Sequence, residues 1–247
     1  MADPAVVPGP CAVIRVRRWV LWPGLVFLAT IGVTAAIARG AAIASGGSTI
    51  APIRSLLPVM VVEDTDVFEA WFAGYPALTL VHVVFGSVFL LLAPFQFSAR
   101  IRKRHLRMHR WSGRVVVVAA VPTVVSGLLF GALSPFGGPA AASAIGLFGT
   151  LFLVSVVQGF AAIRRGDQVR HREWMLRMVS IGAGIATIRV ISIPLMLVTG
   201  LRPMALIGAA FWLGLGMTFV AAELWIRWTR AEAIGSALES PHERSAL

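Results

Sequence analysis

The chain has 247 residues, of which 57% are hydrophobic and only 13% are charged, with a mean hydropathy of +0.82. This composition is too apolar for a soluble domain and indicates an integral membrane protein. The net charge of +11 is compatible with nucleic-acid binding, but the basic segments lack the interleaved aromatic residues that stack on bases. We therefore exclude nucleic acid as a partner and expect the lipid bilayer to surround the chain.

Apolar runs of about twenty residues recur along the chain, the length needed to cross roughly 30 Å of hydrocarbon. They predict six spans, at residues 19–38, 74–97, 112–132, 139–163, 173–199 and 204–228. The fold class is therefore an all-α integral membrane protein with six transmembrane helices. One membrane domain is predicted at 19–230, with tails at 1–18 and 231–247. The predicted loop at 39–73 is the only sizeable one.

Basic residues gather in alternate connections. The basic segments hold Arg15, Arg17 and Arg18, then residues 100–110 and 164–172, then Arg227 and Arg230. The other connections hold Glu63, Asp64, Asp66 and Glu69, with few arginines. The positive-inside rule then orients both termini toward the cytoplasm. The basic segments would contact anionic lipid headgroups on that side.

A basic motif that contains a histidine occurs twice. Residues 107–114 read RMHRWSGR, and residues 170–177 read RHREWMLR. The similarity extends upstream, because residues 86–90 match residues 149–153 at an offset of 149 − 86 = 63, whereas the histidines are offset by 171 − 109 = 62. Spans two and three thus form one helical hairpin, and spans four and five form a second hairpin in the same orientation. The repeat predicts a four-helix core from spans two to five, with spans one and six outside it.

The repeat places His109 and His171 at similar depth on the same side of the membrane. Two such histidines on facing helices can be the axial ligands of a haem b iron. Arginines near them could neutralise the haem propionates, and the candidates are Arg110, Arg114, Arg172 and Arg177. The alternative is that both histidines join the arginines in contacting lipid phosphates.

Ionisable residues inside the spans are informative, because charge there is costly. His82 is predicted either to bond a neighbouring backbone group as a neutral histidine or to serve as a ligand or proton carrier. Arg189 is expected to snorkel outward, with an anionic group such as a carboxylate or a haem propionate as the alternative. Glu223 is expected to form an ion pair with Arg177. Near the basic segments, Gln96 and Gln158 are expected to hydrogen-bond between helices.

The residues around these histidines resemble a known family. The stretch from His82 to Phe97, the two His motifs and Arg189 resemble the bacterial predicted-membrane-protein family "domain of unknown function 2306" over about residues 75–228. The resemblance implies a multi-span inner-membrane protein whose recurring histidines are His82, His109 and His171. It implies no activity.

A looser similarity is to the cytochrome b561-like group, in which a four-helix core binds two haems through four histidines. This chain departs from that pattern, because His82 has Ala144 or Ile145 as its counterpart in the repeat and thus no opposite histidine. The resemblance therefore implies at most one haem, between His109 and His171.

Two functions follow from these observations. One is a haem-binding electron-transfer or quinone-linked membrane protein, motivated by the depth-matched histidines. The alternative is a non-enzymatic small transporter or a membrane assembly or scaffold protein, motivated by the lack of a complete catalytic constellation. The sequence names neither a substrate nor a redox partner.

Overall fold

The computed structural model describes residues 22–134 and 136–239, with side chains up to residue 231. Within this part the regular structure is entirely helical. The six long helices are α2 (Trp22–Ser45), α4 (Pro76–Gln96), α6 (Leu106–Leu133), α7 (Gly138–Arg164), α8 (Gln168–Thr199) and α9 (Pro203–Glu239). The short helices are η2 (Ala51–Leu56), α3 (Val59–Gly74) and α5 (Ala99–Arg104). The predictions for residues 1–21, including Arg15, Arg17 and Arg18, lie outside the described residues.

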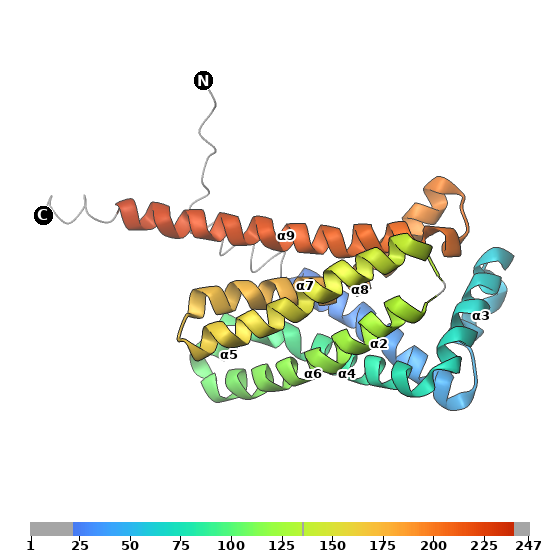
Figure 1. Cartoon of the computed structure of the whole chain (residues 1–247), viewed down its shortest axis with the longest axis horizontal. Helices are drawn as coiled ribbons and strands as arrows, with labels where there is room; N and C mark the ends of the chain where they lie inside the picture. Colours follow the sequence, from blue (N-terminus) through green and yellow to red (C-terminus); the bar gives the residue numbers. More distant parts are fainter. Residues whose placement is uncertain (1–21, 135, 240–247) are drawn as a thin grey trace, which may run out of the picture.

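The six long helices are each long and apolar enough to cross a membrane, which confirms the fold class and the number of spans. The last span covers Pro203–Ala231, and the helix continues to Glu239. In Figure 1 the end of α9 extends past the bundle at the side where α5 lies, and α3 lies at the opposite side. We call these the basic end, where α6 and α8 begin, and the acidic end.

Three predicted boundaries are wrong. The first span continues to Ser45, while α6 begins at Leu106 and α8 at Gln168, several residues before the apolar runs. The reason is that hydropathy reports the hydrocarbon thickness, whereas a helix continues through polar residues until a cap ends it. Asp167 caps the start of α8, because its side chain accepts a hydrogen bond from the Arg170 backbone N–H at 2.9 Å.

The predicted loop at 39–73 is also wrong in part, because most of it is helical. It contains the end of α2, the short η2 and the sixteen-residue α3. The α3 helix lies across the acidic end of the bundle (Figure 1) and does not span it. The carboxylates of α3 interrupt its apolar residues, so its hydropathy is too low for a membrane span. Hydropathy alone therefore predicted a loop in this segment.

The bundle consists of two antiparallel hairpins, α4 with α6 and α7 with α8. Helices α6 and α7 pack directly against each other, whereas α4 and α8 touch little because α2 packs against both. The α9 helix lies on α7 and α8. The core cluster comes mainly from the two hairpins, with Ala29 of α2 and Leu215 of α9 added. The four-helix core with outer spans remains a prediction.

Two glycines let α8 and α9 approach closely. A Cβ at Gly184 would lie 3.0 Å from Cα of Leu215, and one at Gly214 would lie 2.9 Å from the backbone nitrogen of Ile188. Both contacts are with backbone atoms, which cannot move aside as a side chain can. Small residues at this crossing therefore set the short distance between the helices.

Candidate functional site

His109 lies in the first turn of α6, beside the end of α4. The Gln96 amide contacts the Ser112 hydroxyl at 2.7 Å, which confirms the predicted interhelical bond for this glutamine. With its nitrogen toward His109, the amide donates to the histidine backbone carbonyl at 3.3 Å and to Nδ1 at 3.2 Å. It then accepts from the Gly113 backbone N–H at 3.2 Å. Gln158, by contrast, is exposed.

His171 occupies the same place in α8, beside the end of α7. Its Nδ1 donates to the backbone carbonyl of Gly159 at 2.9 Å, so Nε2 carries the free lone pair. Gly159 is the repeat counterpart of Gln96, since 159 − 96 = 63. In each hairpin the residue at this position therefore contacts Nδ1 of the motif histidine, from a side chain in one and from the backbone in the other.

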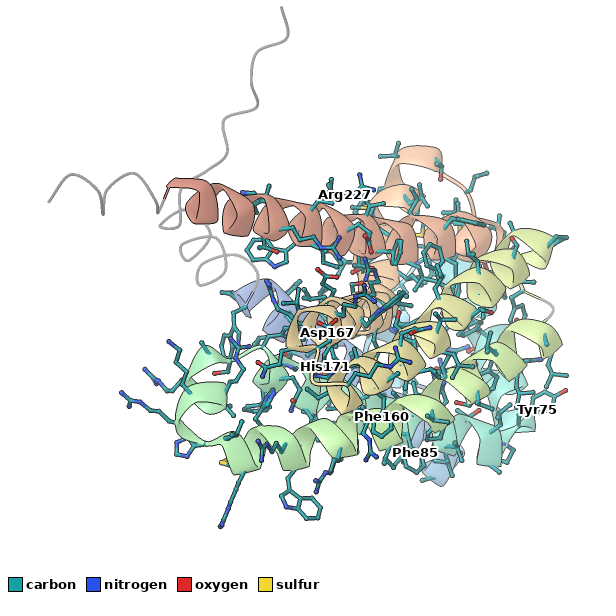
Figure 2. The ribbon with its side chains drawn as sticks, turned by 60° about the vertical axis from the view of Figure 1, so that its left-hand side comes forward. Tyr75, Phe85, Phe160, Asp167, His171 and Arg227 are labelled. Carbon is teal, nitrogen blue, oxygen red and sulfur yellow. The ribbon has the colours of Figure 1, made fainter. Side chains whose placement is uncertain are left out.

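His109 lies within electrostatic range of His171 and of a group of arginines. The arginines that act on it are Arg102 and Arg110. Arg102 also acts on Arg172, so helices α5, α6 and α8 each contribute cations to one region. Figure 2 shows His171 and Asp167 at the beginning of α8, well separated from Tyr75 at the acidic end. The basic end thus brings both predicted ligand histidines into one positively charged neighbourhood.

Each motif also contains a tryptophan followed three residues later by an arginine. The Arg114 guanidinium lies 5.5 Å from the centre of the Trp111 ring, and that of Arg177 lies 4.6 Å from the Trp174 ring. Residues three apart are neighbours on a helix, so this cation–π pair forms locally in both copies. Trp111 is 66% exposed, which leaves the first pair on the surface of the bundle.

The second pair is covered by α9, where Arg177 meets Glu223. Its Nε and Nη2 donate to the two carboxylate oxygens at 2.5 and 3.1 Å, which confirms the predicted ion pair. One turn nearer the basic end, Glu173 and Arg230 form a second side-on pair. The Glu173 side chain is only 6% exposed, so this pair also fastens α8 to α9.

A cavity of about 540 Å³ lies between α7, α8 and α9 and is lined by these two ion pairs. Arg170, Trp174 and Ser155 complete its polar wall, and Leu151 and Phe219 form its apolar part. It is distinct from the histidine neighbourhood, since neither His109 nor His171 lines it. A charged cavity along the first turns of α8 can hold a polar ligand inside the membrane boundary.

His82 and Arg189 lie in the half of the bundle nearer the acidic end. The His82 Nδ1 donates to the Thr123 carbonyl at 3.1 Å and lies 3.0 Å from the Ser126 hydroxyl. This is the hydrogen-bonded histidine that the sequence suggested as one alternative. The expectation that Arg189 snorkels outward is wrong, because its Nη1 donates to the carbonyl of Ile185 at 2.9 Å, back toward the basic end.

The acidic end is held by carboxylates of α3. Asp66 is paired with Arg54 at 2.6 Å, and Asp64 with Arg202 at 2.6 Å. The hydrogen bonds from Arg54 lower the pKa of Asp66. Burial opposes ionisation of Glu69, but hydrogen bonds from Ser48 and Thr49 outweigh it and lower its pKa.

The arginines nominated as propionate contacts are dispersed. Arg177 is paired with Glu223, Arg114 lies over Trp111, and Arg189 lies in the acidic half of the bundle. Among the described residues no group of three or more His, Cys, Asp or Glu could hold a metal ion. Of the arginines that act near the histidines, Arg110 and Arg172 belong to the two motifs, whereas Arg102 lies on α5 and was not a candidate.

A family model described as "Predicted membrane protein (DUF2306)" matches residues 79–226. The chain belongs to this family. The DUF2306 match includes His82, both motif histidines, Arg189 and Glu223, and it ends before Arg230. No curated protein and no solved structure matches the chain. Family membership therefore establishes a multi-span membrane protein in a lipid bilayer and brings no activity with it.

Sequence reasoning missed the charged cavity. Glu173 reads as part of a helix start, Arg230 as a basic residue just beyond the last span, and Ser155 as an ordinary small residue of a span. One signal was available, because Arg170, Glu173 and Arg177 recur at helical spacing, and the last two pair with α9. Charges that continue along one helical face into a span indicate a polar neighbour.

Proposed function

We propose that this DUF2306 protein is an electron-transfer protein that binds one b-type haem through His109 and His171. The observation that carries the proposal is that the repeated motif places both histidines at the basic end within electrostatic range of each other, with His171 held at Nδ1 by a backbone carbonyl. Metal-bound histidines commonly donate their second N–H to a carbonyl in this way, which fixes the ring and leaves Nε2 for the metal.

His109 fits the same requirement with one adjustment. Its Nδ1 lies 3.2 Å from the Gln96 amide, so this glutamine would be its orienting partner. Nε2 is free for iron only when Nδ1 carries the hydrogen, and the amide must then present its oxygen instead of its nitrogen. A half-turn of the amide supplies that orientation without moving either helix.

The cations around the histidines suit the anionic edge of a haem. Arg110 and Arg172, both nominated from the motifs, would neutralise the propionates together with Arg102. A bound haem would supply reversible transfer of one electron. The chain's own contribution is to hold the ligand rings, orient them through Gln96 and Gly159, and balance the negative charge.

We further infer that the basic end lies in the cytoplasm of a bacterial cell. The connections at that end carry arginines on α5 and between α7 and α8, whereas the carboxylates of α3 lie at the opposite end. This asymmetry across short connections sets orientation in bacterial inner membranes. Cysteine-labelling at the start of α8 and at α3, in intact and broken cells, tests the orientation.

A visible spectrum of the protein purified from haem-sufficient cells tests the haem proposal. The wild type is expected to show a Soret band that disappears in His109→Ala and in His171→Ala. His105→Ala is the matched control, because His105 is exposed between α5 and α6 and should leave the band unchanged. Folded but colourless wild-type protein would overturn the proposal.

The orienting role of Gln96 gives a finer test. Gln96→Glu can only accept from Nδ1 of His109 and should retain the haem. Gln96→Leu removes the acceptor and should weaken haem binding by about 10- to 100-fold, as loss of a second partner of a metal-bound histidine commonly does. Equal binding by both variants would show that Gln96 does not orient His109.

A further inference from the structure

The cavity between α7, α8 and α9 has more positive than negative charge. Three guanidiniums line it, from Arg170, Arg177 and Arg230, against the two carboxylates of Glu173 and Glu223. Arg170 is the third cation of the lining, and its ion-pair partner, Asp167, does not line the cavity. The Arg170 guanidinium lies 3.4 Å from Asp167 on the exposed side of α8, and its side chain is 72% exposed.

The ion pairs leave hydrogen-bond donors available. Arg177 uses Nε and Nη2 to hold Glu223, and Arg230 uses the same two atoms to hold Glu173. Side-on pairing of this kind leaves both N–H groups of Nη1 free in each arginine. Each carboxylate oxygen, in contrast, already accepts a charge-assisted bond, so the cavity offers donors in excess of acceptors.

The rest of the wall sets the size and polarity of a ligand. The volume of about 540 Å³ exceeds what a single ion needs, and Leu151 and Phe219 give it an apolar part beside the charges. Along α8 the polar wall extends from Arg170 to Arg177, roughly 10 Å at the rise of an α-helix. Ion pairs that only fastened α8 to α9 would need neither this space nor a third arginine.

We propose that this cavity is a binding site for a phosphate group, carried either by a phospholipid headgroup or by a soluble phosphate ester. A phosphate offers several oxygens to converging guanidiniums, and arginine is the side chain whose planar donors match them. The apolar wall accommodates the glycerol or acyl carbon that follows the phosphate. The site lies apart from His109 and His171 and does not depend on haem.

Binding of two probes to the purified full-length protein in phosphatidylcholine nanodiscs tests the site. The probes are sn-glycerol 3-phosphate, followed by the rise in unfolding temperature, and phosphatidylglycerol, counted by native mass spectrometry. The test variant is Arg170→Gln, which removes the third cation of the lining and leaves the two ion pairs between α8 and α9 intact. The matched control is Arg165→Gln, an exposed arginine at the same end that does not line the cavity.

The wild type and Arg165→Gln are expected to bind alike, and Arg170→Gln about five- to ten-fold more weakly, as loss of one charge-assisted contact implies. Binding of phosphatidylglycerol alone assigns the phosphate to a lipid, and binding of glycerol 3-phosphate as well assigns it to a soluble ester. The proposal is overturned if neither probe binds, or if the two variants lose the same affinity. Equal unfolding temperatures without probe verify that both variants fold.

Discussion

The two copies of the His motif share their local structure and differ in what covers them. In both, a tryptophan stacks with the arginine three residues on, and Nδ1 of the histidine contacts the end of the preceding helix. The first copy ends on the surface, with Trp111 66% exposed. The second is covered by α9, which brings Glu223 to Arg177 and Arg230 to Glu173. Both copies thus share one local unit, and the sixth span adds charged partners to the second copy.

Removal of a partner of the buried ion pair should have the largest effect. Glu223→Ala leaves the Arg177 guanidinium, only 17% exposed, without its carboxylate. We expect the free energy of unfolding to fall by about 2–3 kcal/mol, below the range for fully buried pairs because this pair is partly exposed. Arg114→Ala in the first copy should cost less than about 0.5 kcal/mol. Thermal unfolding in detergent measures both, and equal losses would contradict the comparison.

The next largest difference between the two copies is expected when a glycine near each histidine, Gly159 in α7 or Gly113 in α6, is replaced by alanine. A Cβ at Gly159 would overlap Cε of Met175 and lie 3.3 Å from Cβ of Trp174, whereas one at Gly113 would lie 3.1 Å from Oε1 of Gln96. We expect Gly159→Ala to destabilise by about 1–2 kcal/mol through overpacking, and Gly113→Ala by less. Met175→Ala should restore part of the loss in the Gly159→Ala background. Without that rescue, the overlap is not the cause.

Loss of the tryptophan from each cation–π pair should change the free energy of unfolding by different but smaller amounts. Trp174→Leu removes the ring that lies 4.6 Å from the Arg177 guanidinium at the covered copy. The expected loss is about 1 kcal/mol, against less than about 0.5 kcal/mol for Trp111→Leu at the exposed copy. Unfolding temperatures of the two variants measure the difference. A larger loss for Trp111→Leu would show that the exposed pair carries an unrecognised contact.

The smallest expected effect is a loss of stability at low pH. It should appear at the ion pairs of α3 before it appears at the pairs between α8 and α9. Hydrogen bonds from Arg54 lower the pKa of Asp66 in the folded protein, and the pKa of Glu69 is lowered as well. A lowered carboxyl pKa stabilises the fold above the unfolded value of about 4 and loses that contribution as pH falls through the folded value. We therefore expect α3 to exchange its amides faster below about pH 4.

Hydrogen exchange followed by mass spectrometry measures this opening. Glu69→Gln should show faster exchange in α3 already at neutral pH, because it cannot pair with Arg39. The α8–α9 contact serves as the internal control and should keep its protection over the same pH range. Faster exchange at that contact before α3 opens would reverse the expected order.

Much of the architecture could be predicted because it depends on composition and local spacing. The six spans followed from hydrophobic length, and the pair of Glu223 with Arg177 followed from two charges at equal depth in neighbouring spans. The starts of α6 and α8, just before His109 and His171, could not be predicted from the sequence, because caps and polar turns carry no hydropathy signal. The predicted outward direction of the Arg189 side chain was wrong for a similar reason, since its guanidinium binds a backbone carbonyl and does not reach the water interface.

The sequence by itself determined the membrane class, the six spans, the duplicated motif and its local tryptophan–arginine pairs. All of these depend on residues a few positions apart or on the apolar content of one segment. Tertiary structure alone decided that Gln96 and Gly159 hold the two histidines, that α3 pairs its carboxylates with distant arginines, and that α9 closes a charged cavity over the second copy. These contacts join segments far apart in the chain, so they depend on which helices pack together.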